Sequence, residues 1–342
     1  MNFDLNSLIT GTLDKGSKNL ITDVDGVLVG HSTISLGEIQ TGVTVLLPHG
    51  GDIFHQKYLA ASHVINGFGK SIGLIQVDEL GTIETPIVLT NTLSIGTAVD
   101  AIIKYMLKNN LDIADKTGTV NPLVLECNDG KINNIREQKI EHKHIYEAIN
   151  NAKSHFMQGA IGAGRGMRCH GIKGGIGSSS RRFKIFKKDY TIGSLVLSNH
   201  GRFEDLIING QKVSDVFKDP NTFEAEKEKG SIIVILATDA PLTERQIKRV
   251  CKRAVAGLSR TGSFIGNGSG EIVLAFSTAH KINHYQKELD SIKFLPDNEL
   301  DIIFKATAET VHESVLNSLF YAETVTGKDN YRCVCLNDLI KK

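Results

Sequence analysis

Residues 261–278 have the sequence TGSFIGNGSGEIVLAFST and follow a basic helical segment. The apolar run from Ile272 to Phe276 within them predicts a buried strand. Just before that strand, glycines flank Ser269, which leaves little bulk around its hydroxyl and opens its backbone on both sides. Such a serine suits a nucleophile that attacks a carbonyl, for example that of Gly268. A plain Gly-Ser turn leading into a strand is the alternative, and this local pattern leaves both open.

Cleavage of the Gly268–Ser269 bond would give Ser269 an amine as well as a hydroxyl. An N-terminal amine can serve as the base for a hydroxyl on the same residue. The ordinary pKa of an α-amino group, ~7.7–8, lies close to neutral pH, where a general base works best. The segment is therefore a candidate for nucleophilic catalysis without a separate base.

The composition is that of an ordinary globular protein, with 342 residues, 41% hydrophobic and 23% charged. Lys and Arg number 39 against 38 Asp and Glu, so we expect neither a nucleic-acid nor an anionic-membrane partner. No apolar run approaches the ~20 residues of a membrane helix, and the first residues do not resemble a signal peptide. The five cysteines are odd in number and scattered, which favours reduced thiols and a cytoplasmic location.

Neither a metal nor a cofactor is expected from the motifs. The 12 histidines show no zinc-ligand spacing such as His-Glu-x-x-His. The glycine-rich stretch 159–177 places Met167 where a dinucleotide loop needs its third glycine. The tripeptide at 69–71 has Val64 where a phosphate loop needs its first glycine.

Strands and helices alternate along the chain, which predicts an α+β or layered α/β fold. Apolar runs predict strands at 42–47, 72–77, 122–127, 190–198 and 231–237. Helical spacing predicts helices over 92–107, 145–156 and 243–258, and a further apolar stripe from Ala308 to Phe320. No repeat or low-complexity run divides the chain.

Separate motifs in one order, from about Ile21 to Asp329, carry a family resemblance. They are ITDVDGVLVGH at 21–31, TGVT at 41–44, NG at 66–67, TPIVLTNT at 85–92, KGGIG at 173–177, ATDAPL at 237–242, RTG at 260–262, NGSG at 267–270, AFST at 275–278 and AETVTG at 322–327. The chain thus resembles the autoprocessing serine aminopeptidases: the L-aminopeptidase/D-amidase-esterases (DmpA-like) and the β-peptidyl aminopeptidases (BapA-like).

The resemblance implies a four-layer α-β-β-α sandwich, similar to the N-terminal-nucleophile hydrolases but with different connectivity. It implies one domain over 1–342, cut between Gly268 and Ser269 into chains 1–268 and 269–342 that stay associated. The second chain would have 74 residues (342 − 268 = 74). A homo-oligomer of such processed protomers is expected.

The resemblance also assigns the site. Ser269 is the expected nucleophile, and Thr307 and Glu309 are expected to orient it and its amine. Independently, residues two apart at the end of a strand share a face, as we expect of Thr307 and Glu309; a helix-start carboxylate is the alternative for Glu309. Glu126 is expected to bind the amino group of the substrate, with a structural salt bridge as the alternative. Asn199 is the candidate oxyanion donor, or else a turn residue.

These residues predict an aminopeptidase or amidase that releases N-terminal residues from short peptides, amides or esters. Two alternatives remain: an acyltransferase on a related autoprocessing scaffold, and an uncleaved, inactive binding protein. Asp25 stands where the family usually has proline, and Lys70 where it often has glutamate. Lys70 changes the charge near the expected substrate entrance, so its effect concerns specificity more than chemistry.

Overall fold

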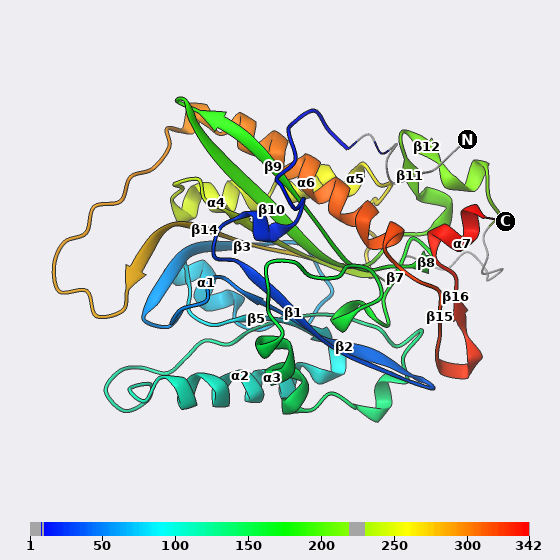
Figure 1. The fold of residues 1–342 in the computed structure, drawn as a ribbon, viewed down its shortest axis with the longest axis horizontal. Helices are drawn as coiled ribbons and strands as arrows, with labels where there is room; N and C mark the ends of the chain where they lie inside the picture. The colour runs from blue at the N-terminus through cyan, green and yellow to red at the C-terminus, as the bar shows by residue number, and fades with distance from the viewer. Residues whose placement is uncertain (1–7, 9, 219–229, 342) are drawn as a thin grey trace.

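Two β-sheets face each other in the computed structural model, which describes residues 8, 10–218 and 230–341 (Figure 1). The larger sheet has the strand order β4 (Thr82–Ile83), β3 (Gln56–Gly67), β14 (Gly270–Asn283), β13 (Ser231–Thr238), β10 (Lys188–Asn199) and β9 (Gly175–Ile185). The smaller sheet has the order β1 (Leu28–Leu36), β2 (Ile39–Leu47), β5 (Ile87–Asn91) and β6 (Leu123–Cys127).

Helices cover the outer face of each sheet. The helices α2 (Ile95–Asn109) and α3 (His142–Asn150) lie on the smaller sheet, and α4 (Glu244–Cys251), α5 (Ala254–Ser259) and α6 (Asp301–Phe320) lie on the larger one. The remaining elements are α1 (Leu74–Leu80), α7 (Leu336–Ile340), β7 (Arg168–Cys169), β8 (Ile172–Lys173), β11 (Ile207–Ile208), β12 (Gln211–Lys212), β15 (Val325–Thr326) and β16 (Arg332–Cys333). The predicted α-β-β-α sandwich is confirmed. No helix in the described ranges is both long and apolar enough to cross a bilayer.

Strand β13 shows that both faces of the larger sheet are buried. Ile233 and Ile235 belong to the core between the two sheets, whereas Ile232 and Val234 belong to the core beneath α4, α5 and α6. A strand buried on both faces has a continuous apolar sequence, as SIIVILAT does. Strands β13 and β14 run parallel, so both begin at the same edge of the sheet.

Two sequence predictions give the wrong type of element, and two predicted helices have the wrong bounds: the one over 145–156 ends at Asn150, and the one over 243–258 is divided into α4 and α5. The segment 72–77 contains the start of helix α1 rather than a strand, because Gly73 adopts a left-handed conformation (φ 95°) from which the helix begins. The segment around Thr307 and Glu309 is the middle of α6 rather than the end of a strand. Short apolar runs such as Ile302–Phe304 suit either structure, and the threonines of α6 are accommodated because Thr307 donates its hydroxyl to the Ile303 carbonyl, at 2.8 Å.

A buried ionic network fastens α6 to β9 and to the N-terminal segment. Arg181 on β9 donates from Nε to Glu309 at 3.2 Å and from Nη2 to Glu313 at 2.6 Å, and all three side chains are buried. The backbone N–H groups of Thr12 and Leu13 also donate to Glu309. Burial alone would raise the pKa of Glu309, but these N–H donors and Arg181 hold it below its ordinary value.

Replacing Arg181 with Met should lower the free energy of unfolding by about 3–5 kcal/mol, since two buried carboxylates lose their cation. Urea unfolding at pH 7 measures this. The matched control is Lys184→Met on the same strand, whose exposed ion pair with Asp189 is worth at most about 1 kcal/mol.

The pH dependence of this loss is a second readout. Carboxylates with lowered pKa values stabilise the fold at neutral pH and lose that contribution as the pH falls through those values. The difference between wild type and Arg181→Met should therefore shrink as the pH falls below the ordinary pKa of glutamate. A variant as stable as the Lys184→Met control at pH 7 would contradict the network's role.

Candidate active site

One row of residues crosses four strands of the larger sheet where β13 and β14 begin. Gly270 of β14 lies opposite Gly67 of β3 on one side and opposite Ser231 of β13 on the other. Ser231 in turn lies opposite Asn199, the last residue of β10. Neighbouring strands are about 4.8 Å apart, so this row brings two Gly-Ser sequences together.

Ser269 lies at this row, as expected, but its polar groups are occupied by a turn. The side chain is fully buried, and its hydroxyl donates to the Gly266 carbonyl at 2.7 Å. Its backbone N–H donates to the same carbonyl at 3.0 Å, and the Asn66 amide also donates to it, at 3.1 Å. Ser269 is thus held in place as part of a hydrogen-bonded turn.

Ser231 was not predicted as a site residue because it begins the apolar run of β13. The Gly230 carbonyl that precedes it accepts a hydrogen bond from the Gly270 N–H at 3.1 Å. A Cβ at Gly270 would lie 2.6 Å from the Phe68 carbonyl oxygen and 3.3 Å from the Ser231 hydroxyl oxygen, so only glycine fits there. The signal that could have found Ser231 is the Gly-Ser pair directly before a buried strand, the same signal that singled out Ser269.

Glu126 lies near the end of β6 in the facing sheet and is buried. One carboxylate oxygen accepts the Lys70 backbone N–H at 2.8 Å, and the other accepts the Thr92 hydroxyl. Among the described residues no Lys, Arg or His forms an ion pair with it, so the salt-bridge alternative does not hold there. A buried carboxylate with neutral donors is suited to receive a cation, such as a substrate ammonium.

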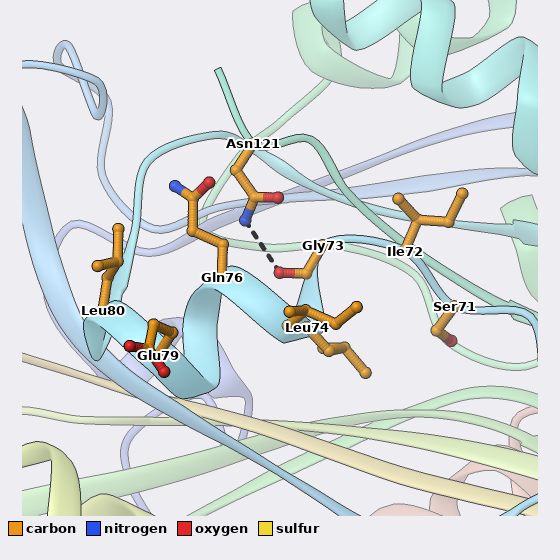
Figure 2. Close-up of a pocket in the computed structure, with 9 residues that line it drawn as sticks. Ser71, Ile72, Gly73, Leu74, Gln76, Glu79, Leu80 and Asn121 are labelled. Carbon is orange, nitrogen blue, oxygen red and sulfur yellow. Dashed lines mark hydrogen bonds between the residues drawn. The ribbon is translucent and has the colours of Figure 1, made fainter. Parts of the chain in front are cut away.

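The loop Phe68–Lys70 connects Glu126 to the row. A Cβ at Gly69 would lie 3.3 Å from the Ile272 side chain of β14 and 3.6 Å from the Glu126 carboxylate. Beyond Lys70 the chain lines a surface hollow of about 580 Å³ around α1, where Asn121 donates to the Gly73 carbonyl at 2.9 Å (Figure 2). Lys70, whose N–H binds the carboxylate, is thus followed directly along the chain by the residues that line this hollow.

Asn199 has a fixed side chain beside Ser231. Its amide oxygen accepts the Arg168 N–H at 2.8 Å, and its amide nitrogen donates to the Asn128 carbonyl at 3.0 Å. An amide nitrogen carries two protons, so the second one can serve another acceptor. Asn199 is the last residue of β10 and does not form a turn. Of its two predicted roles, turn residue and oxyanion donor, the second therefore stays a prediction.

Glu271 is a second acidic residue of this region, and the sequence analysis did not single it out. It follows Gly270 and is fully buried. Burial raises the pKa of the Cys127 thiol on β6, and the negative charges of Glu126 and Glu271 raise it further. The negative charges of Glu126 and Glu271, one from each sheet, therefore both raise the pKa of the same thiol. A charged residue inside an apolar run was the available signal, as for Glu126.

Thr307 and Glu309 are not at this site, so their predicted role beside Ser269 is wrong. On a helix, residues two apart point about 200° away from each other, not to one face. The end of α6 nearest the row is marked by Ser318, which contacts the Ser198 hydroxyl at 2.5 Å. Thr307 lies eleven residues before Ser318, about 16 Å along the helix axis at 1.5 Å per residue.

The position of Arg181 leads to the same conclusion for Glu309. Arg181 belongs to the row of Ile192, Thr238 and Ser277. Ser277 is seven residues, about 23 Å, along β14 from Gly270. Glu309 forms its ion pair with Arg181 at that distant row. Because Glu309 lies within α6 and not in its first turn, the alternative of a carboxylate at a helix start is wrong as well.

Comparison with known proteins gives a family model and relatives that match most of the chain. The model of peptidase family S58 matches residues 19–333. The chain is 34% identical over 340 residues to a beta-peptidyl aminopeptidase, BapA, of Sphingosinicella microcystinivorans, covering 92% of this chain and 85% of that protein.

Two solved structures have the same fold. A protein from Pyrococcus horikoshii is 50% identical, with a TM-score of 0.93 and coverage of 98% of this chain and 96% of that one. The L-aminopeptidase D-Ala-esterase/amidase of Ochrobactrum anthropi is 34% identical, with a TM-score of 0.90 and coverage of 96% and 93%. It is described as a prototype serine aminopeptidase and a new variant of the N-terminal-nucleophile hydrolase fold.

Proposed function

The chain belongs to peptidase family S58 and is a serine aminopeptidase of the N-terminal-nucleophile type, and we propose that its nucleophile is Ser231. The activity is that of an aminopeptidase or amidase, and self-cleavage is typical of the family. The residues that perform it are our proposal, and the observation that carries it is the row Gly270–Ser231–Asn199.

The two Gly-Ser bonds of the row differ in how their carbonyls and hydroxyls are engaged. The Gly270 N–H already donates to the Gly230 carbonyl, which would polarise it for attack by Ser231. The Asn66 amide donates to the carbonyls of Gly266, Asn267 and Ser269, none of which belongs to the Gly268–Ser269 bond. The Ser269 hydroxyl is also bound to Gly266. This comparison favours cleavage at Gly230–Ser231 over the predicted cut at Gly268–Ser269.

After this cleavage the Ser231 amine would take the proton of its own hydroxyl while the oxygen attacks the substrate carbonyl. The second N–H of the Asn199 amide is the proposed donor to the oxyanion. The proton then passes to the leaving amine, and water hydrolyses the acyl-enzyme. Ser269 and Glu271 flank Gly270, opposite Ser231, and are the proposed groups that orient its amine.

Glu126 is the proposed anchor for the free amino group of the substrate. An ammonium would give this carboxylate the cation that the described residues do not supply, which selects short peptides, amides or esters with an unblocked N-terminus. The named relatives are aminopeptidases, so no observation favours the acyltransferase or the inactive binding protein.

A homo-oligomer of processed protomers and a cytoplasmic location complete the proposal. Helix α1 exposes Ile75 (90%) and Leu80 (61%), which both line the hollow around this helix, and exposed apolar groups of this kind often mark a protein interface. All five cysteines are free and buried, which supports a reducing compartment. Light scattering on the native protein measures the first feature, and thiol titration without reductant measures the second.

Intact-mass measurement on the denatured protein should show two chains of 230 and 112 residues (342 − 230 = 112), the second beginning at Ser231. Ser231→Ala should remain full length. Ser269→Ala keeps the nucleophile and should cleave more slowly, at the same bond. Chains of 268 and 74 residues would instead restore Ser269 as the nucleophile, and an uncut wild-type chain would refute self-cleavage.

Glu126→Gln should lower kcat/KM for amino-acid p-nitroanilides by about 100-fold, mainly through a higher KM, because a charge-assisted contact of roughly 2–3 kcal/mol is lost. The matched control is Glu309→Gln, a buried carboxylate at the far row, which should lose stability but keep kcat/KM within a few-fold at a temperature where it is folded. Equal losses in the two variants, or equal wild-type activity on N-acetylated substrates, would contradict the anchor role.

A further inference from the structure

Three side chains with metal-ligand chemistry come together just behind the site row. Cys169 ends β7, His170 follows it directly, and His200 follows Asn199 at the end of β10. All three are buried, and one ligand atom from each lies within 4.8 Å of the other two. Because 31 positions separate Cys169 from His200, spacing along the sequence gave no signal of this cluster.

The hydrogen bonds of His170 fix which of its nitrogens is free. Its Nδ1 lies 3.1 Å from the Arg202 carbonyl oxygen, which can only accept, so Nδ1 carries the proton. Nε2 therefore presents a lone pair, and it is buried without a hydrogen-bond partner in the described structure. A metal-binding histidine commonly donates its other ring N–H to a backbone carbonyl in this way.

His200 presents its ring to the same space. Its Nδ1 lies 3.9 Å from the Cys169 sulfur, and its Nε2 is also buried without a hydrogen-bond partner within the described ranges. The two imidazoles are 5.2 Å apart between ring centroids. A thiol–imidazole hydrogen bond would explain one of these contacts but leaves a buried nitrogen on each ring without a partner in the described structure, which costs free energy.

The backbone around the cluster is shaped to hold these rings. Gly201 has φ +81°, and a Cβ there would lie 2.4 Å from the His170 ring. The His170 N–H also donates to the His200 carbonyl, at 2.6 Å. The turn after β10 therefore closes directly over the imidazole of His170, and the ligand atoms sit on backbone that is already fixed.

We propose that Cys169, His170 and His200 bind one thiophilic d¹⁰ cation, either Zn²⁺ or Cu⁺. Metal–sulfur and metal–nitrogen distances of ~2.3 and ~2.0 Å require ligand atoms roughly 3.3–3.7 Å apart, so the three atoms, now within 4.8 Å of one another, would move closer on binding. A thiolate and two imidazoles suit these ions and not Mg²⁺ or Ca²⁺. Cu⁺ would be complete with three ligands, whereas Zn²⁺ would take a fourth; either ion displaces the thiol proton to solvent.

The metal's role would be positional, because the cluster joins two segments that hold Asn199. Arg168, which directly precedes Cys169, donates its backbone N–H to the Asn199 amide oxygen. His200 directly follows Asn199 along the chain. An ion shared by Cys169 and His200 would fix these segments relative to each other. It would take no part in the serine chemistry.

Metal binding by the purified protein tests this, after treatment with EDTA and a reductant. Zn²⁺ and Cu⁺ are titrated in separate arms against a chromophoric chelator, with ascorbate in the Cu⁺ arm. We expect one equivalent per chain in at least one arm, with a higher Tm, and at least about 30-fold weaker binding in Cys169→Ser and His200→Gln. The matched controls are Cys251→Ser and His312→Gln, buried residues elsewhere, which should bind like wild type.

Co²⁺ substitution of the wild type gives a readout that does not depend on the variants folding. A thiolate-to-cobalt charge-transfer band supports the site, and its absence at full Co²⁺ loading overturns Zn²⁺ as its ion. Wild type that binds neither ion more tightly than Cys169→Ser also overturns it. So does one equivalent whose affinity changes in neither Cys169→Ser nor His200→Gln, because the ion would then lie elsewhere.

Discussion

The parallel pairing of β13 and β14 is the constraint on which the rest of the site depends. Parallel neighbours start at the same edge of a sheet, so the Gly-Ser pairs that precede the two strands must meet. The close contact is possible because Gly270 has no side chain: a Cβ there would run into the Phe68 carbonyl and the Ser231 hydroxyl. The same residue donates its N–H to the Gly230 carbonyl, so one glycine both makes room for the proposed nucleophile and polarises the bond before it.

The buried carboxylates divide into two kinds according to what neutralises them. Glu309 and Glu313 face Arg181, a cation of the same protein, and their work is structural. Glu126 receives only a backbone N–H and a hydroxyl in the described structure, so no cation of these residues neutralises it, which is why we propose it as the anchor for a substrate ammonium. In the sequence, a carboxylate of either kind is a charged residue in a buried segment. The two kinds differ only in the group that each carboxylate contacts in the fold, which the sequence does not show.

The sequence predicts the buried strands better than it predicts the residues of the site. Continuous apolar runs predicted β6, β13 and β14 and the layered class, since burial on both faces leaves a strong local pattern. Glu126 and Asn199 lie at or near the ends of β6 and β10, and their proposed roles stay predictions. Thr307 and Glu309 were misplaced, because α6 is buried nearly all round and its polar residues bond back to its own carbonyls, which obscures the helical period. Ser231 was passed over although it carries the same Gly-Ser signal as Ser269, because it was taken as the first residue of the apolar run of β13. Its pairing with Gly270, 39 positions away (270 − 231 = 39), is visible only in the fold.

The strand order also explains how a cut chain can remain one molecule. With cleavage before Ser231, the C-terminal piece supplies β13 and β14, which lie between β3 of the N-terminal piece on one side and β10 on the other. Ladder hydrogen bonds hold both edges of this inserted pair. The same piece contributes α6, whose Glu309 and Glu313 both form ion pairs with Arg181. Glu309 also accepts hydrogen bonds from the backbone N–H groups of Thr12 and Leu13. With that cut, the ionic network would join the two pieces at the end of the sheet opposite the new N-terminus. Loss of the one peptide bond would then leave the framework in place and free an amine at the row where Ser231 and Asn199 meet.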